Sequence, residues 1–142
     1  AKEQGVEAQV EFRGSLTHDG IAPLYAEAWM LLAPSKVLAN GRRDGIPNVV
    51  IEAMAAGVPV AGTRAAGIEE AVVPGRTGTL SEPNDPQGLA EAIAPLLRDA
   101  DEVDRLGAIA RQSVRETFDA DVNFERLWAL FESHTPDRAG RR

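Results

Sequence analysis

The first third of the chain has two apolar patterns that predict strands, with a helix between them. In residues 7–13 apolar and polar side chains alternate, which predicts a half-buried strand that ends at Gly14. Thr17 offers an N-cap for a helix that extends to Ala28. The unbroken apolar run 29–33 then predicts a strand that is covered on both faces.

The middle of the chain repeats this order with shorter elements. Pro47 suits the first position of a helix that ends at Gly57. Apolar residues predict two further strands at 58–61 and 77–80, with one or two helical turns at 66–72 between them. Strands and helices that alternate over short connections are typical of a parallel sheet.

From Asp85 onward the apolar positions follow helical spacing only, and they predict three amphipathic helices. On the last of these, Trp128 and Phe131 are expected to lie in the core by default, with part of their face exposed if the chain is a fragment. The apolar positions of the three helices, in chain order, are Leu89, Ile93, Leu96 and Leu97 for the first, Val103, Leu106, Ala110 and Val114 for the second, and Phe124, Leu127, Trp128 and Phe131 for the third.

The predicted fold class is therefore α/β, a Rossmann-like parallel sheet flanked by helices. About four strands are few for a doubly wound domain. Residues 1–6 resemble the end of a helix, so we expect that an earlier part of the domain is missing from the N-terminus. One domain is expected over residues 1–134, followed by a disordered tail at 135–142.

Composition excludes several classes of function. The 142 residues contain no cysteine, which removes disulfides and thiolate chemistry, and the two histidines lie far apart, which argues against a zinc site. A formal net charge of −7 argues against a nucleic-acid binder. No long apolar run and no signal-peptide pattern is present, so a cytoplasmic location is expected.

Two acidic residues, Asp44 and Glu52, flank the predicted start of the helix at Pro47. Gly45 and Pro47 interrupt helical geometry between them, so both carboxylates can face one ligand. The free N–H groups of the first helical turn add a favourable position for phosphate. The simpler alternative is that Glu52 offsets the helix dipole and Asp44 is a solvated loop residue.

This stretch is similar to the signature of retaining GT-B glycosyltransferases of group 1 (family 4), E-G-[FI]-[GP]-x(4)-E-A-M-A-x-G-x-P-V. Here residues 44–60 read D-G-I-P-N-V-V-I-E-A-M-A-A-G-V-P-V. The resemblance extends over about residues 8–118. It includes Val10-x-Phe12-x-Gly14, Leu24-Tyr25, Leu32-Ala33-Pro34-Ser35, Gly67-Ile68-x-Glu70, Gly75-x-x-Gly78 and Pro83-x-Asp85.

The resemblance assigns a role to each part of the signature. Glu52 is expected to accept hydrogen bonds from the ribose of a nucleotide-diphosphate sugar, as an acceptor-only carboxylate can. Asp44 is the expected catalytic carboxylate beside the donor sugar, and the loop after Gly14 is expected to hold the base. The residues whose backbone is expected to line the diphosphate and sugar are Gly45, Ile46, Pro47, Asn48 and Val49.

Two departures from the family pattern bear on these roles. Asp44 stands where the family usually has Glu, one methylene longer. The family also clamps the donor phosphates with an Arg and a Lys on an earlier segment that this chain does not contain. Arg42, Arg43 and Arg64 do not occupy those positions and are expected to be surface residues.

The resulting interpretation is the C-terminal, donor-binding half of a glycosyltransferase that transfers a hexose-like unit with retention and without a bound metal or cofactor. Its expected partners are the nucleotide-diphosphate sugar and an N-terminal acceptor domain of the same polypeptide. No nucleic acid is expected, and any contact with the inner face of the membrane is assigned to that absent domain. The alternatives are a non-catalytic nucleotide-sugar-binding or interaction module, and a GT-B epimerase or a starch or sucrose synthase.

Overall fold

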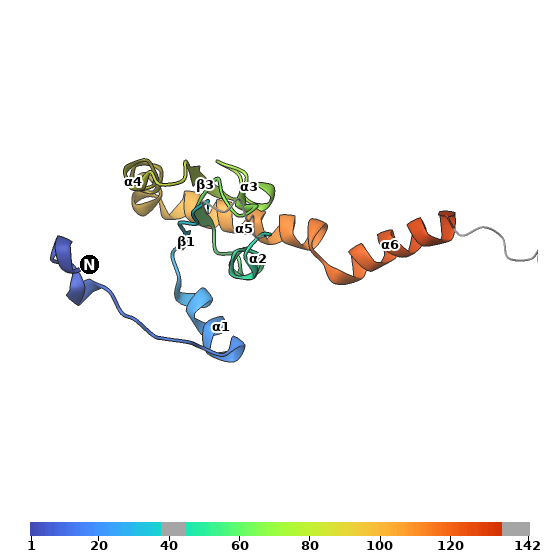
Figure 1. The fold of residues 1–142 in the computed structure, drawn as a ribbon, viewed down its shortest axis with the longest axis horizontal. Helices are drawn as coiled ribbons and strands as arrows, with labels where there is room; N and C mark the ends of the chain where they lie inside the picture. The colour runs from blue at the N-terminus through green and yellow to red at the C-terminus, as the bar shows by residue number, and fades with distance from the viewer. Residues whose placement is uncertain (38–44, 135–142) are drawn as a thin grey trace, which may run out of the picture.

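The computed structural model describes residues 1–37 and 45–134, and its centre is a parallel sheet (Figure 1). The three strands of this sheet are β1 (Leu31–Ala33), β2 (Val60–Thr63) and β3 (Gly78–Ser81), in the order β1-β2-β3. Gly62 pairs with Ala33 on one side and Leu80 on the other. The predicted α/β class with a parallel sheet flanked by helices is therefore confirmed.

Most of the predicted helices are present, with boundaries within a few residues of those expected. They are α1 (His18–Glu27), α2 (Asn48–Ala56), α3 (Ile68–Ala71), α4 (Pro86–Ile93), α5 (Ala100–Thr117) and α6 (Ala120–His134). Short 3₁₀ turns lie at Lys2–Gln4, Glu7–Gln9 and Leu96–Arg98. Within the described ranges, no helix combines the length and apolarity needed to cross a membrane.

Local capping residues explain where α1 begins and where α2 ends. The Thr17 side chain accepts a hydrogen bond from the Gly20 N–H at 3.3 Å, as an N-cap should. Gly57 ends α2 in a left-handed conformation with φ 85°, and its N–H bonds back to the last turn of the helix. Both boundaries are local features, and both were predicted from the sequence.

The strand predicted at residues 7–13 is wrong. Glu7–Gln9 forms a 3₁₀ turn, the chain beyond it is irregular, and Phe12 is 89% exposed. A strand needs a neighbour to satisfy its backbone hydrogen bonds, and none of the described strands pairs with this segment. The described sheet accordingly has three strands, where about four were expected.

Two predictions of burial are also wrong. The strand expected to be covered on both faces is β1, an edge strand of the described sheet, and its Leu32 is 53% exposed. Trp128 and Phe131 on α6 are 54% and 60% exposed, so the core position expected by default is wrong and the alternative of an exposed face fits. Helical periodicity identifies the apolar side of a helix, but it does not say whether another element covers that side.

The core forms where α2 packs against the sheet and α5. Val50 and Met54 of α2 are fully buried, and they join Val60, Ile68 and Val114 in one apolar cluster. Full burial of side chains of this size stabilises the fold by about 1.5–3 kcal/mol each. The helix that carries the sequence signature is therefore packed into the hydrophobic core.

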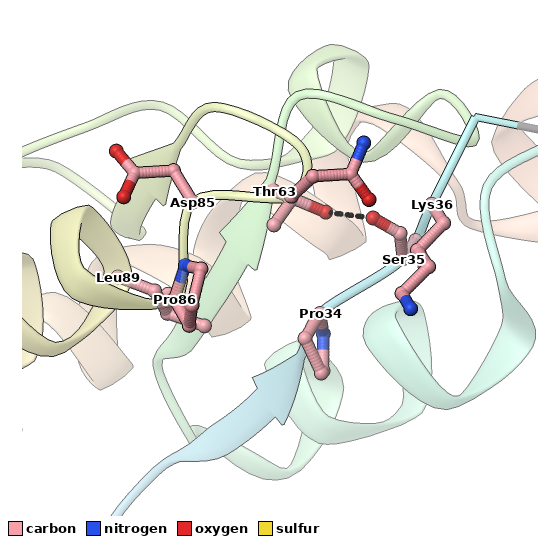
Figure 2. Close-up of a pocket in the computed structure, with 8 residues that line it drawn as sticks. Pro34, Ser35, Lys36, Thr63, Asp85, Pro86 and Leu89 are labelled. Carbon is pink, nitrogen blue, oxygen red and sulfur yellow. Dashed lines mark hydrogen bonds between the residues drawn. The ribbon is translucent and has the colours of Figure 1, made fainter.

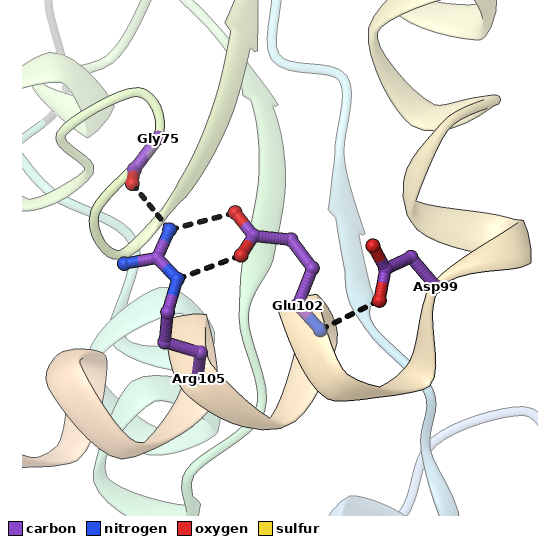
Figure 3. A network of polar contacts seen from close by, with 4 residues as sticks. All are labelled: Gly75, Asp99, Glu102 and Arg105. Carbon is purple, nitrogen blue, oxygen red and sulfur yellow. Dashed lines mark hydrogen bonds and ion pairs between the residues drawn. The ribbon is translucent and has the colours of Figure 1, made fainter.

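A polar network fixes the first turn of α5 (Figure 3). The Asp99 carboxylate accepts a hydrogen bond from the Glu102 N–H at 3.0 Å. The Arg105 guanidinium donates to Glu102 at 2.6 Å and to the Gly75 carbonyl at 2.8 Å, which ties α5 to the turn before β3. Hydrogen bonding from Arg105 lowers the pKa of the Glu102 carboxyl.

Replacement of this cap should measurably weaken the fold. In Asp99→Ala the first turn of α5 loses its side-chain acceptor, and we expect the free energy of unfolding to fall by about 0.5–2 kcal/mol in a urea titration. Asp104→Ala, at an exposed position on the same helix, is the matched control. Equal losses in the two variants would mean that charge, and not capping, explains the contribution of Asp99.

Candidate functional site

The start of α2 presents backbone N–H groups that no side chain caps. Pro47 is the N-cap, one position earlier than predicted, and a proline has no side-chain oxygen with which to cap. Asn48 and Val49 follow it, and both are exposed. N–H groups in a first helical turn have no acceptor within the helix, so here they are available to a ligand.

The loop that leads into α2 packs against the core and against the loop before α3. Ile46 is partly buried and packs against the core cluster. Gly67, in the loop before α3, lies so close that a Cβ there would be 3.3 Å from the Ile46 nitrogen. Gly67 and its neighbour Ala66 both have positive φ, at 68° and 54°, a conformation that costs an L-residue such as Ala66 about 1–2 kcal/mol. This strained turn therefore packs closely against the loop at Ile46.

Glu52 lies in the second turn of α2, and its carboxylate is partly buried. The Tyr25 hydroxyl of α1 donates a hydrogen bond to Glu52 Oε2 at 3.1 Å. Partial burial and the interaction with Glu52 raise the pKa of Tyr25. The effect of the helix dipole falls off within the first turn, so the alternative role of Glu52 as its counter-charge is not favoured by this position.

The structure does not bring all the predicted residues to one place. Asp44 lies outside the described residues, as do Arg42 and Arg43. Gly14 belongs to the N-terminal segment, which extends away from the sheet and from α2 (Figure 1), and a Cβ on it would meet no atom within 4 Å. Arg64 is exposed and pairs with Glu82 at 3.3 Å, as expected for a surface arginine. The residues that do come together are Gly45, Ile46, Pro47, Asn48, Val49 and Glu52.

A pocket of about 390 Å³ opens where the strands end (Figure 2). It lies between the residues that follow β1, the end of β2 and the start of α4, and none of the predicted site residues is among those that line it. The Thr63 hydroxyl donates to the Ser35 carbonyl at 2.6 Å and holds the end of β1 against β2. The lining residues are Pro34, Ser35, Lys36, Thr63, Asn84, Asp85, Pro86 and Leu89.

This pocket and the start of α2 share one edge of the sheet. The chain leaves the carboxyl end of β1, reaches the beginning of α2, and returns along α2 to β2. Ligands of open α/β sheets bind at this carboxyl edge. Sequence reasoning missed Lys36, which lines the pocket. The available signal was its place three residues after the end of a predicted strand.

In residues 1–37 and 45–134, no three histidine, aspartate or glutamate side chains gather closely enough to hold an ion. The described part of the site offers hydrogen-bonding groups: acceptors from Glu52 and donors from the first turn of α2.

Comparison with known proteins identifies a matching family model and several relatives in sequence. The family model described as "Glycosyl transferases group 1" matches residues 1–99. An N-acetyl-alpha-D-glucosaminyl L-malate synthase from Bacillus anthracis is 37% identical over 113 residues, which is 80% of this chain and 28% of that protein. The chain thus spans about a third or less of the length of the relatives it matches.

Solved structures share the same fold. A sucrose-phosphate synthase from Thermosynechococcus elongatus matches with a TM-score of 0.79 and 28% identity, over 94% of this chain and 33% of that one. Anabaena Alr3699/HepE, solved in complex with UDP and glucose, matches with a TM-score of 0.79 and 25% identity, over 93% of this chain and 34% of that one. The same Anabaena protein has also been solved with UDP-glucose.

Proposed function

The chain belongs to the glycosyl transferases group 1 family and has the fold of a GT-B C-terminal domain, and on that premise we propose that it binds the nucleotide-diphosphate sugar of a glycosyl transfer. The observation that carries this proposal is the pairing of a partly buried carboxylate, Glu52, with the uncapped start of the same helix. The two features offer complementary chemistry, acceptors for sugar hydroxyls and donors for phosphate oxygens.

In this proposal Glu52 accepts hydrogen bonds from the ribose hydroxyls of the donor. The N–H groups of Asn48 and Val49 and the backbone of Gly45 face the diphosphate, where the positive end of the helix dipole favours negative charge. Pro47 cannot donate a hydrogen bond, but its fixed φ of −62° sets the direction in which the helix begins. The role proposed for Asp44 is beside the transferred sugar. Contact between the loop after Gly14 and the base would require that segment to lie closer to α2 than it does in Figure 1.

We propose that the reaction transfers a hexose-like unit with retention of the anomeric configuration and without a metal. A carboxylate at Asp44 would stabilise positive charge that develops on the sugar ring in the transition state. Negative charge on the departing diphosphate would be met by helix N–H groups, together with cations from other parts of the protein. The acceptor and the choice of sugar belong to those other parts.

A screen of the full-length polypeptide, with the proposed acceptor domain as well as this donor domain, against nucleotide sugars tests this function, with UDP-glucose as the first. We expect release of nucleoside diphosphate that depends on an acceptor, with a product whose anomeric configuration, read by NMR, matches that of the donor. Binding of nucleotide sugars without turnover would favour the non-catalytic module. Absence of binding to every nucleotide sugar tested would overturn the proposal.

A further inference from the structure

Tyr25 joins two helices that are far apart in the sequence. It lies on α1, and its hydroxyl donates to Glu52 Oε2 on α2 at 3.1 Å, across a separation of 27 residues. Its ring is partly buried and packs against the core cluster. The ring is therefore held by packing, so the hydroxyl is held in place as well.

This hydrogen bond leaves most of the carboxylate free. An ionised carboxylate has two oxygens and about four lone-pair positions, and Tyr25 uses one of them on Oε2. Oε1 and the remaining position on Oε2 can still accept from a ligand. A single fixed donor thus limits rotation of the carboxylate without occupying it.

The chemistry of the tyrosine suits this task near neutral pH. Partial burial and the neighbouring carboxylate raise the pKa of Tyr25 above its usual range, so the phenol keeps its proton. A protonated phenol can donate to Glu52, whereas a phenolate would repel it. The contact is therefore a hydrogen bond in which the phenol donates, and at 3.1 Å it is longer than the short, charge-assisted kind.

We propose that Tyr25 is a positioning residue that orients the Glu52 carboxylate toward the ribose hydroxyls of the donor nucleotide. The proposal rests on the ribose-binding role of Glu52 given above. Tyr25 itself does not touch the nucleotide. It holds the Glu52 side chain in one orientation before the ligand binds. Glu52 then loses less conformational entropy on binding, and the affinity is higher.

Calorimetric titration of UDP into the protein and its Tyr25→Phe variant tests this role. Phenylalanine keeps the ring and removes only the hydroxyl, so the helices stay packed. We expect the dissociation constant for UDP to rise about three- to tenfold, as for the loss of one hydrogen bond. Glu27→Gln, at an exposed position on α1, is the control and should bind UDP like the parent.

A second ligand separates positioning from a merely structural tie. 2′,3′-Dideoxyuridine diphosphate lacks both ribose hydroxyls, so its affinity should be the same for the parent and for Tyr25→Phe. An equal loss of affinity for both nucleotides would mean that Tyr25 only holds α1 against α2, and this would overturn the proposal. In turnover by the full-length polypeptide, the variant should raise KM and leave kcat near the parent value, because the ribose is remote from the reacting bond.

The Glu52→Gln variant distinguishes failure of this inference from failure of the proposed function. If Glu52→Gln weakens UDP binding and Tyr25→Phe does not, the ribose contact stands and the positioning role is wrong. If Glu52→Gln binds UDP like the parent, the proposed role of Glu52 is itself wrong, and the inference falls with it. If both the ribose contact and the positioning role are correct, Tyr25→Phe should weaken UDP binding less in the Glu52→Gln background than in the parent. The reason is that the two residues act through one contact.

Discussion

Glu52→Ala is expected to weaken donor binding by about one to two decades, because it removes charge-assisted hydrogen bonds worth roughly 1.5–3 kcal/mol. Alanine provides no acceptor for the ribose and leaves the Tyr25 hydroxyl without its partner. Titration of UDP-glucose into the parent and the variant measures this loss. Alanine is a good helix former, so α2 itself should persist.

Thermal unfolding and a matched control show whether the loss is specific to the site. Glu27→Ala removes an exposed carboxylate from the neighbouring helix and should change neither donor affinity nor melting temperature. Glu52→Ala should melt within a few degrees of the parent, since its side chain is only partly buried. Unchanged donor affinity in Glu52→Ala would return this residue to a structural role in the helix.

The sequence predicted best those elements whose limits are set by neighbouring residues in the chain. Thr17 caps α1 with its own side chain, and Gly57 ends α2 through a left-handed turn. Pro47 and the apolar spacing of Val50 and Met54 mark the start and the buried side of α2 in the same local way. The helix that carries the candidate site, α2, could therefore be placed from the sequence alone.

Predictions that depended on a distant partner did worse. The alternation in residues 7–13 is typical of a strand, but no described strand lies beside it to receive its hydrogen bonds. Leu32 and Trp128 are apolar and were expected to be covered, yet both are largely exposed. Hydrophobic patterns describe the preference of a segment, whereas burial depends on which other segment packs against it.

The same limit applies to the site. The sequence signature contains Glu52. Its hydrogen bond with Tyr25 joins residues 27 positions apart, and no sequence pattern predicts that contact. The pocket at the carboxyl edge of the sheet draws its lining from three separate segments, which contain Ser35, Thr63 and Leu89. Contacts between helices, and cavities between segments, appear only when the chain is folded.

The second large effect is expected at Gly107, where α5 passes closest to the end of α2. A Cβ built on Gly107 would lie 2.1 Å from the Gly57 carbonyl oxygen and 3.5 Å from Pro59 Cδ. Gly57 cannot easily move away, because its left-handed conformation ends α2 and its N–H is bonded to that helix. Arg111 of α5 also donates to the Ala56 carbonyl, so the two helices are linked again one turn beyond Gly107.

We therefore expect Gly107→Ala to lower the free energy of unfolding by about 1–3 kcal/mol through overpacking, although alanine favours the helix more than glycine does. The melting temperature should fall by roughly 4 °C for each kcal/mol. Gly20→Ala is the matched control: a Cβ there would be 3.5 Å from Thr17 Oγ1, an ordinary contact, so the helix should gain about 0.5–1 kcal/mol. Differential scanning calorimetry of both variants measures the contrast. A Gly107→Ala protein as stable as the parent would mean that α5 can shift against α2 without cost, and the close approach of the two helices would then not be what holds α2 in place.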